Sequence, residues 1–284
     1  MERKALIDML NRDLTDEHAA VVRYLIHSYQ EGEDTPVGAS LLSRCREEMW
    51  HMHWLGMIIG ELGGEPDFTI GPYPFDPASR ATMLKSYVQY EEKLIPHYNA
   101  EAEKVDDPHI RRVLRRESWE SAIHARRFQR LIEKLSPEDA GGLPEGGHEL
   151  PLSFVEKLQG ELLNKYTEML QHIRTSWVFQ NEEKAGWGVM DQAMEKMKHL
   201  AIFAEALAED GVDLPFKAGP IDMSRAVGDA FQKAVGNLQA GGERYRALQK
   251  DDEVRKHSGI VLKVDLAVQQ IDYQKEEIMD WQKK

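Results

Sequence analysis

The chain has 284 residues, of which 42% are apolar and 30% charged, a composition typical of a folded globular protein rather than a disordered one. Its length predicts one large or two ordinary domains, and its net charge of −13 argues against binding to a nucleic-acid backbone. A single cysteine, Cys45, excludes a disulfide framework and a four-cysteine metal site. No apolar run approaches the roughly 18–20 residues of a membrane span, and the start, MERKALIDML, lacks the pattern of a secretory signal. We therefore expect a cytoplasmic protein with neither a nucleic-acid nor a membrane partner.

Helical periodicity dominates the sequence, and no convincing period-two strand is present. Turn-forming stretches divide the first half into four predicted helices, at 3–32, 36–63, 78–105 and 107–135. A segment rich in Pro and Gly, 137–152, predicts a linker. Four more helices are predicted after it, at 153–183, 186–211, 222–249 and 251–282. The expected fold is all-α, with two four-helix bundles in tandem over residues 1–136 and 153–284.

The second half loosely repeats the first. LNRDLTDEHAAVVRY (10–24) aligns with LQGELLNKYTEMLQH (158–172), EEMWHMHWLGMIIGELGG (47–64) with MEKMKHLAIFAEALAEDG (194–211), and KVDDPHIRR (104–112) with QKDDEVRKH (249–257). Because the same elements recur in the same order, the sequence favours a tandem duplication.

In the first half, each predicted helix carries an acid at mid-length on its apolar stripe. These acids are Glu17, Glu48, Glu91 and Glu117, and His51 and His124 lie on or beside the same stripes. Burying an unpaired carboxylate costs several kcal/mol, and the stripes offer no Lys or Arg near these positions. Glu48 and His51 lie three residues apart, about 60° around the helix, so both can reach one ion. The pattern predicts a pair of divalent metal ions, for which Glu and His supply oxygen and nitrogen ligands.

Four segments carry a resemblance to a known family: LNRDLTDEHAAVVRY, REEMWHMHWLGMIIGELGG, YEEKLIPHY and LRRESWESAIH. They resemble the ferritin-like superfamily, close to its bacterioferritin and rubrerythrin branches. The resemblance implies a four-helix bundle around a carboxylate-bridged centre of two iron ions, with manganese or a mixed iron–manganese pair as variants. It matches Glu17 to the first-helix ligand and Glu48 with His51 to the first Glu-x-x-His motif. Glu91 matches the third-helix ligand, because Tyr98 follows at the family's seven-residue spacing.

The fourth helix departs from the family's second Glu-x-x-His motif. The sequence offers Glu117-x-x-Glu120, Ser121-x-x-His124, or an i,i+4 pair of Glu120 with His124. We take Glu117 and His124 as the preferred ligands and Glu120 as the next candidate, leaving the alternatives open.

The second half is expected to have lost the metal centre. Through the repeat, Glu17 becomes Lys165, Glu48 becomes Glu195 and His51 becomes Lys198, and the third helix lacks its acid around Gly236 and Asn237. A lysine ammonium cannot bind a metal ion, but it can pair with a buried carboxylate. We expect a bundle in which lysine charge has replaced the metal ions.

The leading functional hypothesis is an oxidoreductase of the ferroxidase or peroxidase type that reacts with O2 or H2O2. One cysteine cannot build the electron-transfer module of rubrerythrins, so electrons would come from ferrous iron or an external donor. The alternatives are iron binding or storage without turnover, a structural or interaction bundle stabilised by metal, and oxygenation of an organic substrate. A homodimer is left open. Near the site, Tyr24 and Tyr98 are interpreted as core residues with a hydroxyl partner, Cys45 as a small buried residue, and His27 and His97 as surface residues or caps.

Overall fold

The computed structural model describes residues 1–138, 140–143, 150–212, 214 and 216–283. The predicted fold class is confirmed: the described residues form eight α-helices and contain no strand. The chain divides into two compact units, Met1–Gly146 and Gly147–Lys284. The linker predicted at 137–152 lies partly outside the described residues, so it stays a prediction, as do the predicted domain limits.

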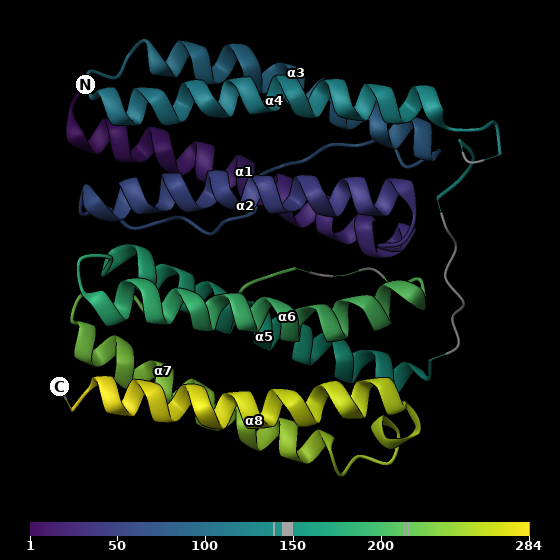
Figure 1. The fold of residues 1–284 in the computed structure, drawn as a ribbon, viewed down its shortest axis with the longest axis vertical. Coiled ribbons are helices and arrows are strands. Elements are labelled where there is room, and N and C mark those ends of the chain that lie inside the picture. The colour runs from purple at the N-terminus through teal and green to yellow at the C-terminus, as the bar shows by residue number, and fades with distance from the viewer. Residues whose placement is uncertain (139, 144–149, 213, 215, 284) are drawn as a thin grey trace. The chain divides into compact units, whose positions relative to one another are not determined.

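Unit 1 contains four long helices joined by two tight turns and one long connection. They are α1 (Arg3–Glu31), α2 (Pro36–Glu61), α3 (Arg80–Ala102) and α4 (Pro108–Lys134). Helix α1 packs along α2 and α3 packs along α4, while α4 also contacts α2 (Figure 1). The long connection between α2 and α3 therefore carries the chain from the first helix pair to the second, as in bundles with one crossover.

Unit 2 has the same plan. Its helices are α5 (Leu152–Val178), α6 (Val189–Glu209), α7 (Val227–Leu248) and α8 (Ser258–Trp281), with a π-helical turn at Lys184–Gly188 and a 3₁₀ turn at Val254–Lys256. Helix α5 packs along α6 and α7 along α8, and further contacts join α5 to α7 and α6 to α8. All eight predicted helices are present, with ends that differ by a few residues. The largest difference is at α8, because Asp251 accepts hydrogen bonds from the backbone N–H groups of Glu253 and Val254 and closes a separate turn first.

Local sequence signals fix where the helices of unit 1 begin. The Thr35 hydroxyl accepts a hydrogen bond from the Gly38 N–H at 3.0 Å, and the Asp107 carboxylate accepts from His109 and Ile110. Each of these caps precedes a proline at the first helical position, where the missing N–H is harmless. With their starts fixed in this way, α2 and α4 hold their mid-length polar residues at the level of those on α1 and α3.

None of the helices in the described part of the chain combines the length and the apolar character needed to cross a membrane.

Candidate metal centre

All four helices of unit 1 bring polar side chains into one buried space. Helix α1 contributes Glu17, α2 Glu48 and His51, α3 Glu91, and α4 Glu117 and His124. Every one of these residues is at most 2% exposed. Of the seven predicted ligands, Glu120 lies nearer the surface.

Five of these six buried residues form two groups of ligand atoms that share Glu48, and Glu117 belongs to neither group. Glu17, Glu48 and His51 make one group and Glu48, Glu91 and His124 the other, each with its ligand atoms within 4.8 Å of one another. Glu48 Oε2 lies 2.8 Å from Nδ1 of His51, and Glu48 Oε1 lies 2.8 Å from Nδ1 of His124. One carboxylate thus offers a separate oxygen to each histidine, which is the arrangement of a bridging ligand between two ions.

Glu17 and Glu91 complete the two groups on opposite sides of Glu48. Glu17 Oε2 lies 3.2 Å from Nδ1 of His51, and Glu91 Oε1 lies 3.4 Å from Nδ1 of His124. The two imidazole rings are nearly parallel, with centroids 6.1 Å apart. Each half of the site therefore holds one histidine and one carboxylate of its own.

Both histidines make the same kind of contact with their outer nitrogens. His51 Nε2 lies 2.7 Å from Glu120 Oε2, and His124 Nε2 lies 2.6 Å from Glu47 Oε2. A metal-bound histidine usually donates its second N–H to a carboxylate, which fixes the tautomer and leaves the other nitrogen to the metal. Glu120 therefore contacts His51 from the outside and belongs to neither group of ligand atoms. Glu47 was not predicted, because it lies beside the apolar stripe of α2 and no spacing on that helix marks it.

Several buried polar atoms at the centre have no hydrogen-bond partner among the described residues. They are both carboxylate oxygens of Glu117, Oε1 of Glu48, Oε2 of Glu91 and Nδ1 of His124. The 2.8 Å contact between Glu48 Oε1 and His124 Nδ1 lacks the alignment of a hydrogen bond, although the two atoms are close. Buried polar atoms without partners are costly, and ions held between them would satisfy these atoms together. The residues present fit a metal pair.

In the described part of unit 1, the carboxylates of the centre also lack a lysine or arginine partner. Within the described residues, no Lys or Arg lies in ion-pair contact with Glu17, Glu48, Glu91 or Glu117. Burial raises the pKa of Glu117 well above its usual range and that of Glu17 to about 8. Burial would also raise the pKa of Glu48, but contacts with His124 and His51 hold it well below its usual range. Burial would lower the pKa values of His51 and His124, but the neighbouring carboxylates raise them well above their usual range. Without bound metal ions, the centre therefore limits repulsion by keeping protons on these histidines and on Glu17 and Glu117.

Two tyrosines position the carboxylates of Glu17 and Glu91. The Tyr98 hydroxyl donates to Glu17, and the Tyr24 hydroxyl donates to Glu91 Oε1 at 2.6 Å. Both rings are fully buried, as the interpretation of core residues with a hydroxyl partner requires. Tyr73, in the connection between α2 and α3, places its hydroxyl 2.8 Å from that of Tyr24 and must donate to it. Tyr73 was missed because it lies outside any predicted helix.

Two further expectations near the centre have opposite outcomes. Cys45 is fully buried and its Sγ lies 3.4 Å from the backbone oxygen of Val21, so the prediction of a small buried residue is confirmed. The prediction of His27 as a surface residue or cap is wrong. His27 is 3% exposed and its Nδ1 contacts the Tyr87 hydroxyl, because the turn of α1 that carries it is covered by α3 and by Phe75.

A surface cleft of about 280 Å³ lies outside the histidine pair. It is lined by Glu47, Trp50, Trp54, Arg116 and Glu120. The two carboxylates that contact the outer histidine nitrogens are therefore also walls of the cleft. Arg116 lies over the Trp54 ring, 4.2 Å from its centroid, and pairs with Glu120 at 2.9 Å.

Unit 2 replaces the centre with a cluster of lysine and arginine. Lys165 and Lys196 are at most 1% exposed, and Lys165 Nζ lies 2.7 Å from Glu168 Oε2. Lys196 lies 3.8 Å from the same oxygen, and Arg244 contacts the other Glu168 oxygen at 2.7 Å. Despite burial, these cations lower the pKa of Glu168 to about 2. In the described part of unit 2, no group of three acidic, histidine or cysteine residues could hold a metal ion.

One part of the predicted alignment is corrected. Glu195 and Lys198, predicted to replace Glu48 and His51, pair with each other on the outer side of α6, where Lys198 is 72% exposed. The buried residues are Lys196 and His199, one position further along. The match of Glu48 to Lys196 has the same sequence offset as the match of Glu17 to Lys165. A slip of one residue turns a helix by about 100°, which is enough to exchange its inner and outer faces.

No protein-family model, no curated protein and no solved structure matches this chain. The all-helical fold and the buried carboxylate–histidine groups are compatible with a di-iron helical bundle.

Proposed function

We propose that unit 1 is a ferritin-like bundle that binds two iron ions, or manganese in their place, and acts as an oxidoreductase toward O2 or H2O2. The observation that carries the proposal is the sharing of Glu48 between two groups of ligand atoms, each completed by a histidine Nδ1. In the proposed centre, Glu17 and His51 would hold one ion and Glu91 and His124 the other, and Glu48 would be shared between them. Glu117 supplies a further carboxylate from α4.

Charge balance supports two divalent ions. The four buried acids, Glu17, Glu48, Glu91 and Glu117, carry four negative charges when ionised, and neutral imidazoles add none. Two divalent cations neutralise that charge completely. Carboxylate and imidazole ligands suit iron and manganese, and they do not distinguish these metals from zinc.

When bound, the ion pair supplies redox-active centres able to pass electrons to an oxidant. The chain's own residues orient the ligands: Tyr98 and Tyr24 hold Glu17 and Glu91, while the outer carboxylates hold the histidines. The apolar stripes around the centre exclude bulk water. We assign the cleft beside Trp50 and Trp54 as the approach for ferrous iron or an external electron donor, because its walls contact both histidines.

The first experiment measures metal content per chain and oxidant consumption on the same protein. After dialysis that removes weakly bound ions, wild type is expected to retain about two iron or manganese ions and to consume O2 or H2O2 when reduced. The double variant Glu48→Ala, His51→Ala should lose both properties. Glu195→Ala with Lys198→Ala is the matched control, since it removes the same residue spacing from the outer side of α6.

The outcomes separate the alternative functions. Two ions without oxidant consumption, in particles far larger than a dimer, would indicate iron storage. Two ions that raise only the melting temperature would indicate a structural bundle. If wild type binds no iron or manganese, the proposed function is wrong.

A further inference from the structure

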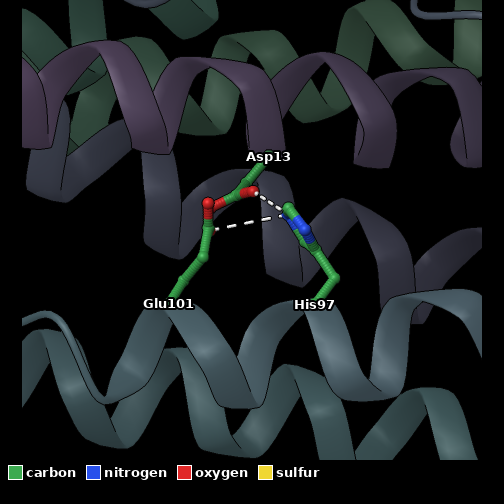
Figure 2. A group of neighbouring side chains, drawn as sticks. All are labelled: Asp13, His97 and Glu101. Atoms are coloured by element: carbon green, nitrogen blue, oxygen red, sulfur yellow. Dashed lines mark hydrogen bonds and ion pairs between the residues drawn. The ribbon is translucent and has the colours of Figure 1, made fainter.

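A second cluster of ligand-type side chains lies between α1 and α3, apart from the centre. Figure 2 shows Asp13 reaching down from α1 toward His97 and Glu101, which rise from neighbouring turns of α3. His97 Nε2 lies 2.9 Å from Asp13 Oδ1 and 3.5 Å from Glu101 Oε2. One ligand atom from each residue lies within 4.8 Å of the other two. None of the three residues is a proposed ligand of the centre.

The two carboxylates are buried, and their charge is only partly matched. Asp13 is 0% and Glu101 5% exposed, while the His97 side chain is 40% exposed. Asp13 Oδ2 and Glu101 Oε2 have no hydrogen-bond donor in the part of the chain that the structure describes. Protonated His97 balances one of the two carboxylates, and the other has to keep a proton, because burial and a hydrogen bond with Asp13 raise the pKa of Glu101 to about 8. A divalent cation between the helices would replace that proton, balance the remaining charge and give both oxygens a partner.

Unit 2 carries an arginine in the corresponding place. Because Tyr98 matches Tyr245 on the third helix, His97 matches Arg244 and Glu101 matches Leu248. Asp13 matches Glu161, and Arg244 Nε lies 3.3 Å from Glu161 Oε2. In unit 2 the Arg244 guanidinium therefore pairs with two carboxylates, Glu161 and Glu168, where in unit 1 two carboxylates face an imidazole.

The same exchange occurs at the centre, where Lys165 and Lys196 stand in the places of Glu17 and Glu48. At both positions unit 2 supplies a side-chain cation of its own, fully buried at Lys165 and Lys196 and partly exposed at Arg244. By this correspondence, the carboxylates of the Asp13 cluster in unit 1 lack a lysine or arginine cation among the described residues.

We infer that Asp13, His97 and Glu101 form a third site, which binds a single divalent cation independently of the two-ion centre. Two carboxylates and one imidazole are a ligand set suited to Fe²⁺, Mn²⁺, Co²⁺ or Zn²⁺. The half-exposed His97 gives the ion access to water, so this site should exchange its ion faster than the centre.

Titration of the full chain with Co²⁺, followed by its visible absorption and by elemental analysis, tests the third site. Wild type should bind three ions, His97→Ala two, and Glu48→Ala with His51→Ala one. Combining these three substitutions should abolish binding. Glu101→Gln, which keeps the shape of the side chain, repeats the loss of one ion if His97→Ala disturbs folding. His109→Ala, an exposed histidine of α4, is the matched control and should keep three ions.

The result separates the third site from the proposed function. One ion in wild type, lost in His97→Ala, would support the third site while removing the two-ion centre. Two ions in wild type that survive His97→Ala and Glu101→Gln would overturn the third site and reduce the cluster to an ion pair.

Discussion

His51 and His124 have the same surroundings, although they lie on different helices. Each turns Nδ1 toward Glu48 and Nε2 toward a carboxylate at the surface. Burial would raise the pKa of Glu120, but hydrogen bonds from His51 and Arg116 lower it, and His124 and Arg44 act in the same way on Glu47. Both outer carboxylates are therefore ionised at neutral pH and can accept the imidazole N–H.

Replacing either outer carboxylate should weaken metal binding without removing a ligand. In Glu120→Gln, His51 loses its charged acceptor, so its tautomer and ring orientation are less well fixed. We expect an affinity loss of about 10- to 100-fold, measured by competition with a chelator. Glu103→Gln, which removes an exposed partner of Arg115, should leave the affinity unchanged. An equal affinity in Glu120→Gln and wild type would mean that the outer contact has no role in binding.

Single-helix spacing predicts which residues of the centre face inward but not what they touch. Glu17 and Glu91 interrupt apolar stripes, so their burial follows from periodicity. The contacts of Glu120 and Glu47 cross between α2 and α4, and nothing in either helix alone reveals them. His97 was interpreted as a surface residue or cap, because its partner Asp13 is 84 positions away in the sequence.

At the scale of helices, the sequence predicted existence and approximate limits well. Pro36, Pro108 and the caps before them are local signals, and Gly32 ends α1 with a positive φ of 84°. The alignment of α6 failed by one residue because loosely repeated sequences tolerate such a slip. Only packing decides between Glu195 and Lys196 as the inward side chain, and the structure places Lys196 inside.

The buried Lys196 should make the stability of unit 2 depend on pH. Burial and the nearby Lys165 ammonium lower the pKa of Lys196 from 10.5 to about 7. Between these values the unfolded chain binds the proton more strongly, so the free energy of unfolding should rise as pH increases from about 7 to 9.5. The slope approaches about 1.4 kcal/mol per pH unit, and it vanishes below pH 7, where both states are protonated and the destabilisation by the buried charge is complete.

Urea denaturation of wild type and Lys196→Met at pH 7 and 9 measures this contribution as a difference. The variant should lack the rise and should be the more stable protein at pH 7. Lys198→Met, on the same helix but 72% exposed, should keep the wild-type dependence. Parallel pH profiles for wild type and Lys196→Met would show that Lys196 is charged in both states across this range.

At the scale of the whole molecule, the two units share one arrangement of helices but differ in how the charge of their buried carboxylates is balanced. The interior of unit 1 is rich in carboxylates and histidines, whereas unit 2 sets Lys165, Lys196 and Arg244 against Glu161 and Glu168. Unit 2 thus has its cations built into the chain, while the proposed centre of unit 1 would take them from solution. Metal should therefore stabilise one unit and leave the other unchanged.

Differential scanning calorimetry of the full chain with and without Mn²⁺ tests this asymmetry. A ligand that binds only the folded state at 100 times its Kd stabilises by about 2.7 kcal/mol, which should raise the transition of unit 1 by about 5–10 °C. Leu10→Ala and Leu238→Ala remove fully buried leucines from units 1 and 2 and should identify the transitions, at a cost of about 2–5 kcal/mol each. The metal-sensitive transition should be the one lowered by Leu10→Ala, and its shift should fall sharply in Glu48→Ala with His51→Ala. A shift of the transition assigned by Leu238→Ala would contradict this division, because the lysines of unit 2 leave no place for the metal.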